Sequence, residues 1–150
     1  MRTHVLQAEQ RIARPLAEVF AFYARVENLE RITPPWLRFG LVSDPSAELH
    51  EGSLIEYRLR LHGLPLRWTS AIDLWQPGRA FVDRQVRGPY RLWHHRHEFA
   101  AIGRETVVRD YVKYALPLGA LGELAHALVV RRDLERIFAF RRQAVAELFA

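Results

Sequence analysis

Residues 88–99 read GPYRLWHHRHEF, and this stretch decides how the chain folds. After a Gly-Pro turn, side chains of a β-strand point alternately to opposite faces. Trp93, His95, His97 and Phe99 then share one face, and the other face ends in ionisable side chains. Two large aromatic rings favour burial, so we expect this face, with two of the three histidines, to point inward.

A period of two continues on both sides of this strand, from about residue 36 to residue 115. Glycines interrupt the pattern at the spacing expected for turns of an antiparallel meander. We therefore predict six strands in succession, at residues 37–43, 53–62, 65–76, 79–87, 90–101 and 105–115.

Helical patterns flank this strand-rich region. A first strand at residues 4–13 precedes Pro15, which suits the first turn of a short helix, and a second short helix is expected at residues 28–32. Residues 120–149 have an apolar stripe at helical spacing. A sheet of about seven strands must bury one face, and only this last helix is long enough to cover it. The prediction is an α+β domain in which a curved antiparallel sheet surrounds a long C-terminal helix.

Composition excludes several functions. The 150 residues suit one domain, and the absence of cysteine removes disulfides and thiolate chemistry. The net charge of +5 comes mainly from arginines that are spread along the chain, so no nucleic-acid partner is expected. The apolar run near residues 116–130 is too short and interrupted for stable membrane insertion. The N-terminus lacks the apolar region of a signal peptide, so a cytoplasmic location is expected.

The predicted concave face carries polar groups among apolar ones. Alternation places Tyr57 inward on one strand, and Trp68, Ser70, Ile72 and Leu74 inward on the next. The full set of expected ligand-binding residues is Tyr57, Trp68, Asp83, Gln85, Trp93, His95, His97, Asp110, Tyr114 and Arg141. Unpaired buried polar groups are costly, so these residues indicate either an internal network or a ligand-accepting cavity.

Three stretches carry a family resemblance: FVDRQVRGPYRLWHHRHEF, TVVRDYVKYALPLG and RRDLERIFAFRRQAV. They resemble the START-like superfamily, also called SRPBCC, of the polyketide cyclase/dehydrase type. The resemblance implies a helix-grip fold over the whole chain, residues 1–150, and a hydrophobic ligand such as a lipid, quinone or polyketide-like molecule. The stretches look most like members that occur alone or fused to an epimerase-like protein, which implies an epimerase-like partner. The resemblance supplies no catalytic residues.

The inward histidines allow three chemical interpretations. Two histidines at i and i+2 have the spacing of metal ligands, and Asp110, Asp83 or Gln85 would have to supply a third. This spacing alone is a weak signal, so we expect no metal and no cofactor. Paired with a carboxylate, His95 with Asp110 or His97 with Asp83, either histidine could abstract a proton. The third interpretation, a structural polar network, is the one we favour. An inward Arg141 is expected to pair with Asp83 or Asp110.

Three functions remain open. The first is binding of a hydrophobic or aromatic small molecule between sheet and helix. The second is a cyclase or dehydratase with His95, His97 and Asp110 as candidate catalytic residues. The third is an interaction or chaperone module for an epimerase-like partner, which requires a cavity filled by side chains and an exposed apolar patch.

Overall fold

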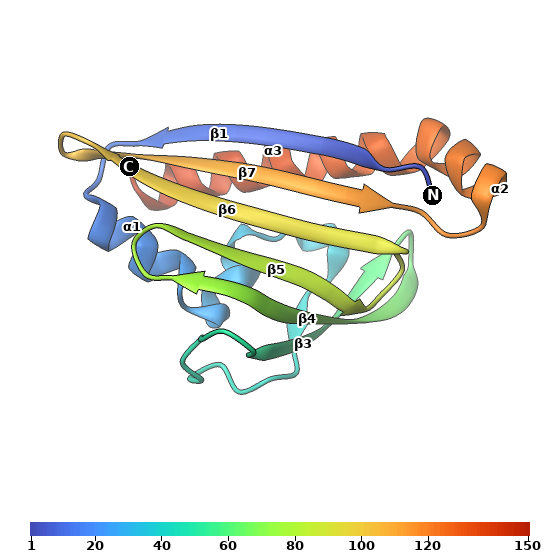
Figure 1. The fold of residues 1–150 in the computed structure, drawn as a ribbon, viewed down its shortest axis with the longest axis horizontal. Coiled ribbons are helices and arrows are strands. Elements are labelled where there is room, and N and C mark those ends of the chain that lie inside the picture. Colours follow the sequence, from blue (N-terminus) through green and yellow to red (C-terminus); the bar gives the residue numbers. More distant parts are fainter.

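A computed structural model describes residues 1–150, and it has the predicted α+β architecture (Figure 1). The elements run in the order β1 (His4–Ile12), α1 (Leu16–Tyr23), η1 (Val26–Ile32), η2 (Pro35–Leu37), β2 (Gly40–Leu41), β3 (Leu54–Leu61), β4 (Leu64–Gln76), β5 (Ala80–Arg87), β6 (Leu92–Ile102), β7 (Glu105–Ala115), α2 (Gly119–Ala125), η3 (His126–Val130) and α3 (Arg131–Leu148). The elements η1 and η2 are 3₁₀ helices, and η3 is a π-helical segment.

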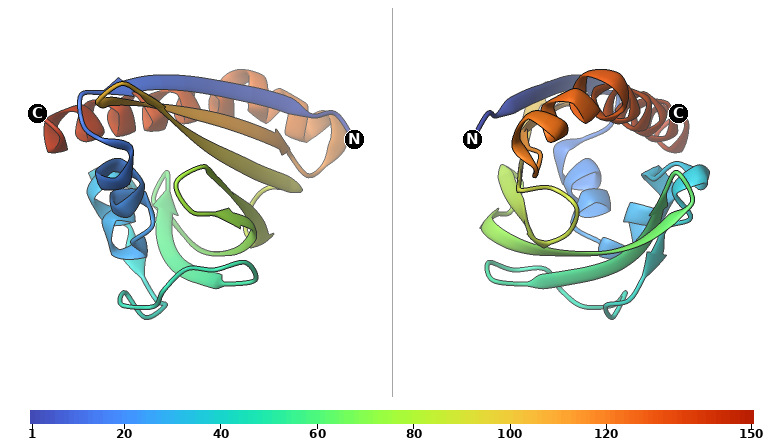
Figure 2. Two further views of the ribbon diagram at one scale, coloured as in Figure 1. Left: turned by 60° about the vertical axis from the view of Figure 1, so that its left-hand side comes forward. Right: turned by 90° about the vertical axis from the view of Figure 1, so that its right-hand side faces the viewer.

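The seven strands form one antiparallel sheet in the order β1-β7-β6-β5-β4-β3-β2. Consecutive strands from β2 to β7 are neighbours, as expected for hairpin connections, and β1 pairs with β7 at one edge. The sheet curves round a central space, with α3 along one side of that space and α1, η1 and η2 gathered at one end (Figure 2). The predicted helix-grip arrangement is therefore confirmed.

Two predicted elements differ from those observed. The strand expected at residues 37–43 is reduced to Gly40–Leu41, because Arg38 adopts a left-handed backbone (φ 47°) and Asp44 caps a turn through Ser46. The helix expected at residues 120–149 begins at Gly119 and consists of α2, η3 and α3 in succession. Its π-helical segment inserts an extra residue into the turn, which an apolar stripe of period 3.6 does not reveal.

A register shift in β4 reverses one predicted orientation. The pairing of β4 with β5 shifts between Ile72 and Leu74, and beyond that point Trp75 faces inward instead of Leu74. Trp75 packs on Phe81 with ring centroids 5.4 Å apart and joins the apolar core. The prediction that Leu74 belongs to the inner set was wrong, because a bulge inverts the alternation of every residue after it.

The core has two apolar clusters along the concave face. One lies at the end covered by α1 and η1, and includes Val19, Ile72, Val108 and Val145. The other, around Trp68, Trp93 and Leu134, packs the opposite end of the sheet against α3. None of the helices combines the length and the apolar character that a membrane crossing requires.

Candidate functional site

A cavity of about 200 Å³ lies between the concave face of the sheet, α3 and the 3₁₀ segments. It is lined by 28 residues, of which 20 are hydrophobic, so its walls are mainly apolar. The two apolar clusters do not meet completely, because one helix does not fill the whole concavity of a seven-stranded sheet. Such a cavity suits an apolar ligand held by a few polar groups.

Seven of the ten expected ligand-binding residues line this cavity, namely Tyr57, Trp68, Asp83, Trp93, His95, His97 and Arg141. Gln85, Asp110 and Tyr114 do not. Asp110 lies next to the cavity, where its carboxylate contacts both histidines. Tyr114 is buried, and its hydroxyl meets His126 Nε2 at 2.8 Å, so it belongs to the packing between β7 and the C-terminal helix.

Gln85 holds a turn together instead of facing the cavity. Its side-chain amide donates to the carbonyl oxygen of Tyr90 (2.7 Å) and accepts from the Tyr90 backbone N–H (3.0 Å). The pairing of β5 with β6 ends at Arg84 and His94, so Gln85 pairs only with Ser70 of β4, and its other side borders the turn to β6. A Cβ at Gly88 would lie 2.6 Å from Gln85 Oε1, so a larger residue there would displace the side chain that holds this turn.

His95 and His97 form a crossed network with two aspartates on the flanking strands. His95 Nε2 donates to Asp110 Oδ1 (2.7 Å), and His97 Nε2 donates to Asp83 Oδ2 (2.6 Å). The second nitrogens face the opposite carboxylates, at 3.8 Å from His95 to Asp83 and 3.3 Å from His97 to Asp110. The shorter of these distances lacks hydrogen-bond geometry, so His97 Nδ1 stays without a partner. Both histidine side chains are almost fully buried. We call Asp83, His95, His97 and Asp110 the histidine–aspartate quartet.

The two histidines differ in their preferred charge. Burial lowers the pKa of His95, and the neighbouring His97 lowers it further against the opposing effect of Asp110 and Asp83. Burial also opposes a charge on His97, but Asp110 and Asp83 together outweigh it and raise its pKa. The quartet therefore favours one shared positive charge, carried by His97, with His95 neutral.

Both aspartates are held ionised. Burial alone would raise the pKa of Asp110, but Arg141 and the hydrogen bonds from the histidines lower it well below its ordinary value. The pKa of Asp83 is likewise lowered, since His97 and His95 outweigh its burial. Two carboxylates are thus balanced by His97 and Arg141, which leaves a nearly neutral cluster beside an apolar cavity.

Arg141 is inward, but it makes no ion pair with either aspartate. Its guanidinium lies over the rings of Tyr23 and Phe138, at 5.7 and 5.9 Å from their centroids. The prediction of a direct pair with Asp83 or Asp110 was wrong, because no carboxylate lies within 4.0 Å of this side chain. The aromatic faces hold the charge instead, and Arg141 acts on the aspartates through space.

The quartet is a poor metal site, although ligand atoms of Asp83, His95 and His97 lie within 4.8 Å of one another. Each histidine already donates its Nε2–H to a carboxylate. The positive charge of Arg141 also stabilises the ionised aspartates already. A cation would have to displace both hydrogen bonds and approach a guanidinium. Hydrogen bonding and proton sharing are the chemistry that this arrangement suits.

Other residues outside the expected ligand-binding set shape the site or its surroundings. Alternation along residues 90–101 places Tyr90 on the face opposite Trp93 and was misleading here. Tyr90 lines the cavity because it lies before the first residue of β6, where alternation does not yet apply. Phe81 stacks on the His97 ring with centroids 4.0 Å apart. Ser70 accepts a hydrogen bond from the buried indole N–H of Trp68 (2.9 Å), which explains a serine among apolar neighbours. Trp36 contacts Phe140 of α3 and so anchors its loop.

Comparisons with known proteins agree with this architecture. The Zhui aromatase/cyclase from Streptomyces sp. R1128 is 17% identical with a TM-score of 0.68, over 95% of this chain and 94% of that chain. A START superfamily protein from Mycobacterium smegmatis is 12% identical with a TM-score of 0.71, over 97% and 99%. Norcoclaurine synthase from Thalictrum flavum, in complex with dopamine and hydroxybenzaldehyde, is 13% identical with a TM-score of 0.68, over 98% and 86%. At these identities the similarity concerns the fold.

No curated protein matches the sequence. Residues 12–140, however, match the model of one family, described as polyketide cyclase / dehydrase and lipid transport. This match covers most of the chain, including every strand from β2 to β7 and most of α3. The resemblance expected from the sequence is thereby confirmed, and the chain belongs to the polyketide cyclase/dehydrase and lipid transport family.

Proposed function

We propose that the protein binds a compact aromatic molecule, with at least one hydroxyl or carbonyl group, in the cavity beside the histidine–aspartate quartet. The observation that carries this proposal is the placement of the quartet and Arg141 at the wall of an otherwise apolar cavity. Apolar burial would supply most of the binding free energy, and the quartet would orient the polar group.

The aromatic walls favour a planar ligand. Trp68 and Trp93 meet edge to face with centroids 5.4 Å apart, and Tyr57 stacks on Trp68 at 6.0 Å. A planar ring can pack against such faces with favourable geometry. Dopamine and hydroxybenzaldehyde, which accompany norcoclaurine synthase, are compact phenolic molecules and support this ligand class.

Cavity size favours a small molecule over a lipid with two acyl chains. Pockets for drug-sized ligands enclose roughly 300–1,000 Å³. The cavity here encloses about 200 Å³, so a ligand of one or two fused rings fits better than a longer chain. A quinone headgroup or a short polyketide-like ring system would meet this limit.

Acid–base catalysis is the second candidate function, and the asymmetry of the two histidines supports it. With His95 neutral and its Nε2–H donated to Asp110, its Nδ1 keeps a lone pair that can accept a proton. His95 would take the proton of an activated methylene carbon, and the resulting carbanion would attack a carbonyl carbon of the same ligand. The carbonyl π electrons would move to its oxygen, which takes the proton back from His95. Replacing His95 would then abolish turnover while ligand binding persists.

The interaction-module hypothesis has mixed support. It requires a cavity filled by side chains, whereas the cavity here is open. It also requires an exposed apolar patch, and the segment from just before α2 to the end of η3 does expose Leu118, Leu121, Leu124, Leu128 and Val129. An epimerase-like partner stays a prediction from the resemblance, and we favour ligand binding.

Native mass spectrometry of the protein purified from its own host tests the proposal. Ile137, half-buried on α3, lines the cavity, and Ile137→Trp would fill part of it. Gln143→Trp adds the same ring to an exposed position of the same helix and is the matched control. We expect a stoichiometric organic adduct on the wild type and on Gln143→Trp, and its loss from Ile137→Trp. Identical adduct patterns in the wild type and Ile137→Trp would contradict the proposal.

A further inference from the structure

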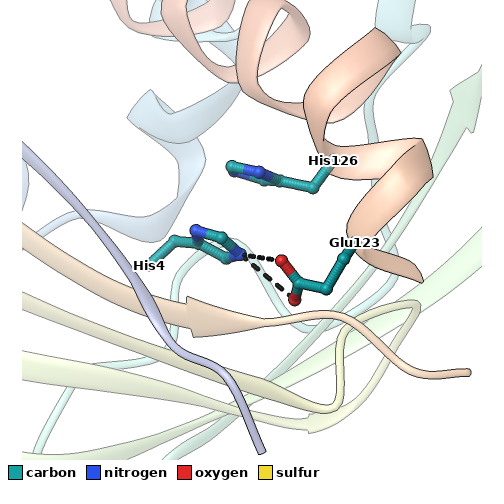
Figure 3. A group of neighbouring side chains, drawn as sticks. All are labelled: His4, Glu123 and His126. Carbon is teal, nitrogen blue, oxygen red and sulfur yellow. Dashed lines mark hydrogen bonds and ion pairs between the residues drawn. The ribbon is translucent and has the colours of Figure 1, made fainter. Parts of the chain in front are cut away.

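A second histidine cluster lies at the N-terminal end of the C-terminal helical segment, and its residues do not line the cavity. His4 comes from the start of β1, Glu123 from α2, and His126 from the first position of η3 (Figure 3). One nitrogen from each imidazole and one carboxylate oxygen lie within 4.8 Å of one another. Three elements that are distant in the sequence thus bring two imidazoles and one carboxylate together.

Local structure holds the two helical residues on one face. Glu123 and His126 are three residues apart, so their side chains are neighbours on the helix surface. Gly122 lets α2 approach the preceding loop, since a Cβ there would lie 2.0 Å from the Pro117 carbonyl oxygen. The π-helical segment begins at His126, and such segments are frequent at functional sites. The helix therefore presents Glu123 and His126 to the start of β1.

One of the required lone pairs is free, and the other is engaged only in a part-exposed contact with Glu123 that an ion can replace. His126 Nε2 meets the Tyr114 hydroxyl at 2.8 Å, so His126 Nδ1 has no protein partner. His4 contacts Glu123 through Nε2, at 3.0 and 3.3 Å from the two carboxylate oxygens. Metal-binding histidines usually have their second nitrogen held by a neighbouring polar group, which is the role that Tyr114 can take for His126.

We propose that His4, Glu123 and His126 bind a divalent transition-metal ion, with Zn²⁺ as the best match to this donor set. Two imidazoles and one carboxylate are an established zinc combination, and a water molecule can complete the tetrahedron. The side chains of His4 and Glu123 are 15% and 26% exposed, so an ion can enter from solvent. Arg2 lies 3.7 Å from Glu123, and its side chain is 75% exposed, so it can turn toward solvent when an ion binds.

Ion binding would change the arrangement of the rings. The imidazoles of His4 and His126 stack face to face, with centroids 3.6 Å apart and planes 17° from parallel (Figure 3). A shared ion must lie near the plane of each ring, so coordination tilts the rings out of the stack. The ion would then connect the N-terminal strand to the C-terminal helix and stabilise their packing.

Isothermal titration of the full chain with ZnCl₂ tests the proposal, with Co²⁺ absorption as a spectroscopic probe of geometry. We expect one Zn²⁺ per chain, with affinity at least tenfold weaker in His4→Gln, Glu123→Gln and His126→Gln. His62→Gln is the matched control, because His62 makes an exposed contact with Asp133 (2.6 Å) and lies outside the cluster. Circular dichroism shows whether each variant is folded. Glu123→Gln is expected to disturb folding least, because the Glu123 side chain is part-exposed.

Three outcomes would overturn the proposal. They are a wild type with no saturable Zn²⁺ binding, a Glu123→Gln variant with wild-type affinity, and loss of binding in His95→Gln, which would place the ion at the quartet. A rise in melting temperature with Zn²⁺ in the wild type, absent in His4→Gln, would support it independently.

Discussion

His95 and His97 stack in β6 with ring centroids 3.6 Å apart, and each donates a hydrogen bond to a different aspartate. Residues at i and i+2 of a strand share one face, so the two imidazoles cannot avoid each other. Two positive charges at this separation in a buried site repel strongly. The pair therefore binds one added proton, and so carries one positive charge, more readily than two.

The histidines should titrate in opposite directions from their ordinary pKa. We expect ¹H–¹⁵N NMR of the imidazoles to give His97 a pKa above about 6.5 and His95 a pKa below it. His97→Gln should raise the pKa of His95, because it removes a neighbouring positive charge. If both rings titrate with the same pKa, near the ordinary value for histidine, then the positive charge is not held preferentially by His97.

The same substitution should change how stability depends on pH. A raised pKa contributes stability below the unfolded value of about 6.5, and that contribution is lost as pH rises through the folded-state pKa of His97. The advantage of the wild type over His97→Gln should thus be largest below about pH 6.5 and shrink toward alkaline pH. Urea unfolding at a series of pH values measures this difference in the free energy of unfolding. A difference that grows with pH would contradict the raised pKa of His97.

Asp110→Asn should destabilise the fold strongly. It removes the charge that balances His97 and Arg141 in a buried setting. Breaking a buried pair by changing one partner costs roughly 3–5 kcal/mol. The control is Asp73→Asn, whose exposed pair with Arg84 is expected to contribute about 0–1 kcal/mol. Denaturant unfolding measures the loss of unfolding free energy in both variants. Equal losses would show that the quartet contributes no more to stability than an exposed ion pair.

Arg141→Gln should make the protein more sensitive to acid. A lowered aspartate pKa gives stability above the unfolded value of about 3.9, lost as pH falls through the folded pKa. Without Arg141 the pKa of Asp110 rises, so the acid-unfolding midpoint should move to higher pH. Arg132→Gln, on the exposed surface of α3, should leave the midpoint unchanged in circular dichroism. A shift of the same size in Arg132→Gln would indicate a general charge effect.

Gly122→Ala should destabilise the junction between β7 and α2. Its Cβ would meet the Pro117 carbonyl oxygen at 2.0 Å, and overpacking of this kind costs roughly 1–3 kcal/mol. Gly40→Ala is the matched control, because nothing lies within 4 Å of a Cβ there. Thermal unfolding compares the two, and an unaffected Gly122→Ala would mean that the helix start adjusts freely.

Sequence periodicity was sufficient for the helix-grip fold and for part of the site. Strict alternation in β6 correctly places His95 and His97 inward, and both expected aspartate pairings are present. Alternation fails where the register shifts, as at Leu74, and it does not reveal that the Gln85 side chain bonds the Tyr90 backbone. Bulges and pairing limits depend on tertiary packing, which period-two patterning does not encode.

Longer-range relationships were also beyond the sequence. The Arg141 guanidinium lies over Tyr23 of α1 and Phe138 of α3, and this contact depends on how the two helices are placed. From the sequence alone, a carboxylate partner is the simpler expectation. The cluster of His4, Glu123 and His126 joins the first strand to the last helix, and only the Glu123-x-x-His126 spacing is visible locally. Contacts between chain ends become apparent only once the sheet order places β1 beside β7.

The most direct test of the central claim is ¹⁵N NMR of the histidine imidazoles during titration with 2-naphthol, a compact hydroxylated aromatic. If the cavity binds such a ligand beside the quartet, the signals of His95 and His97 should shift saturably while that of exposed His50 does not. Ile137→Trp should weaken the response at least tenfold. The account would be contradicted by saturable binding that leaves both signals unmoved, by undiminished binding to Ile137→Trp, or by no binding at all.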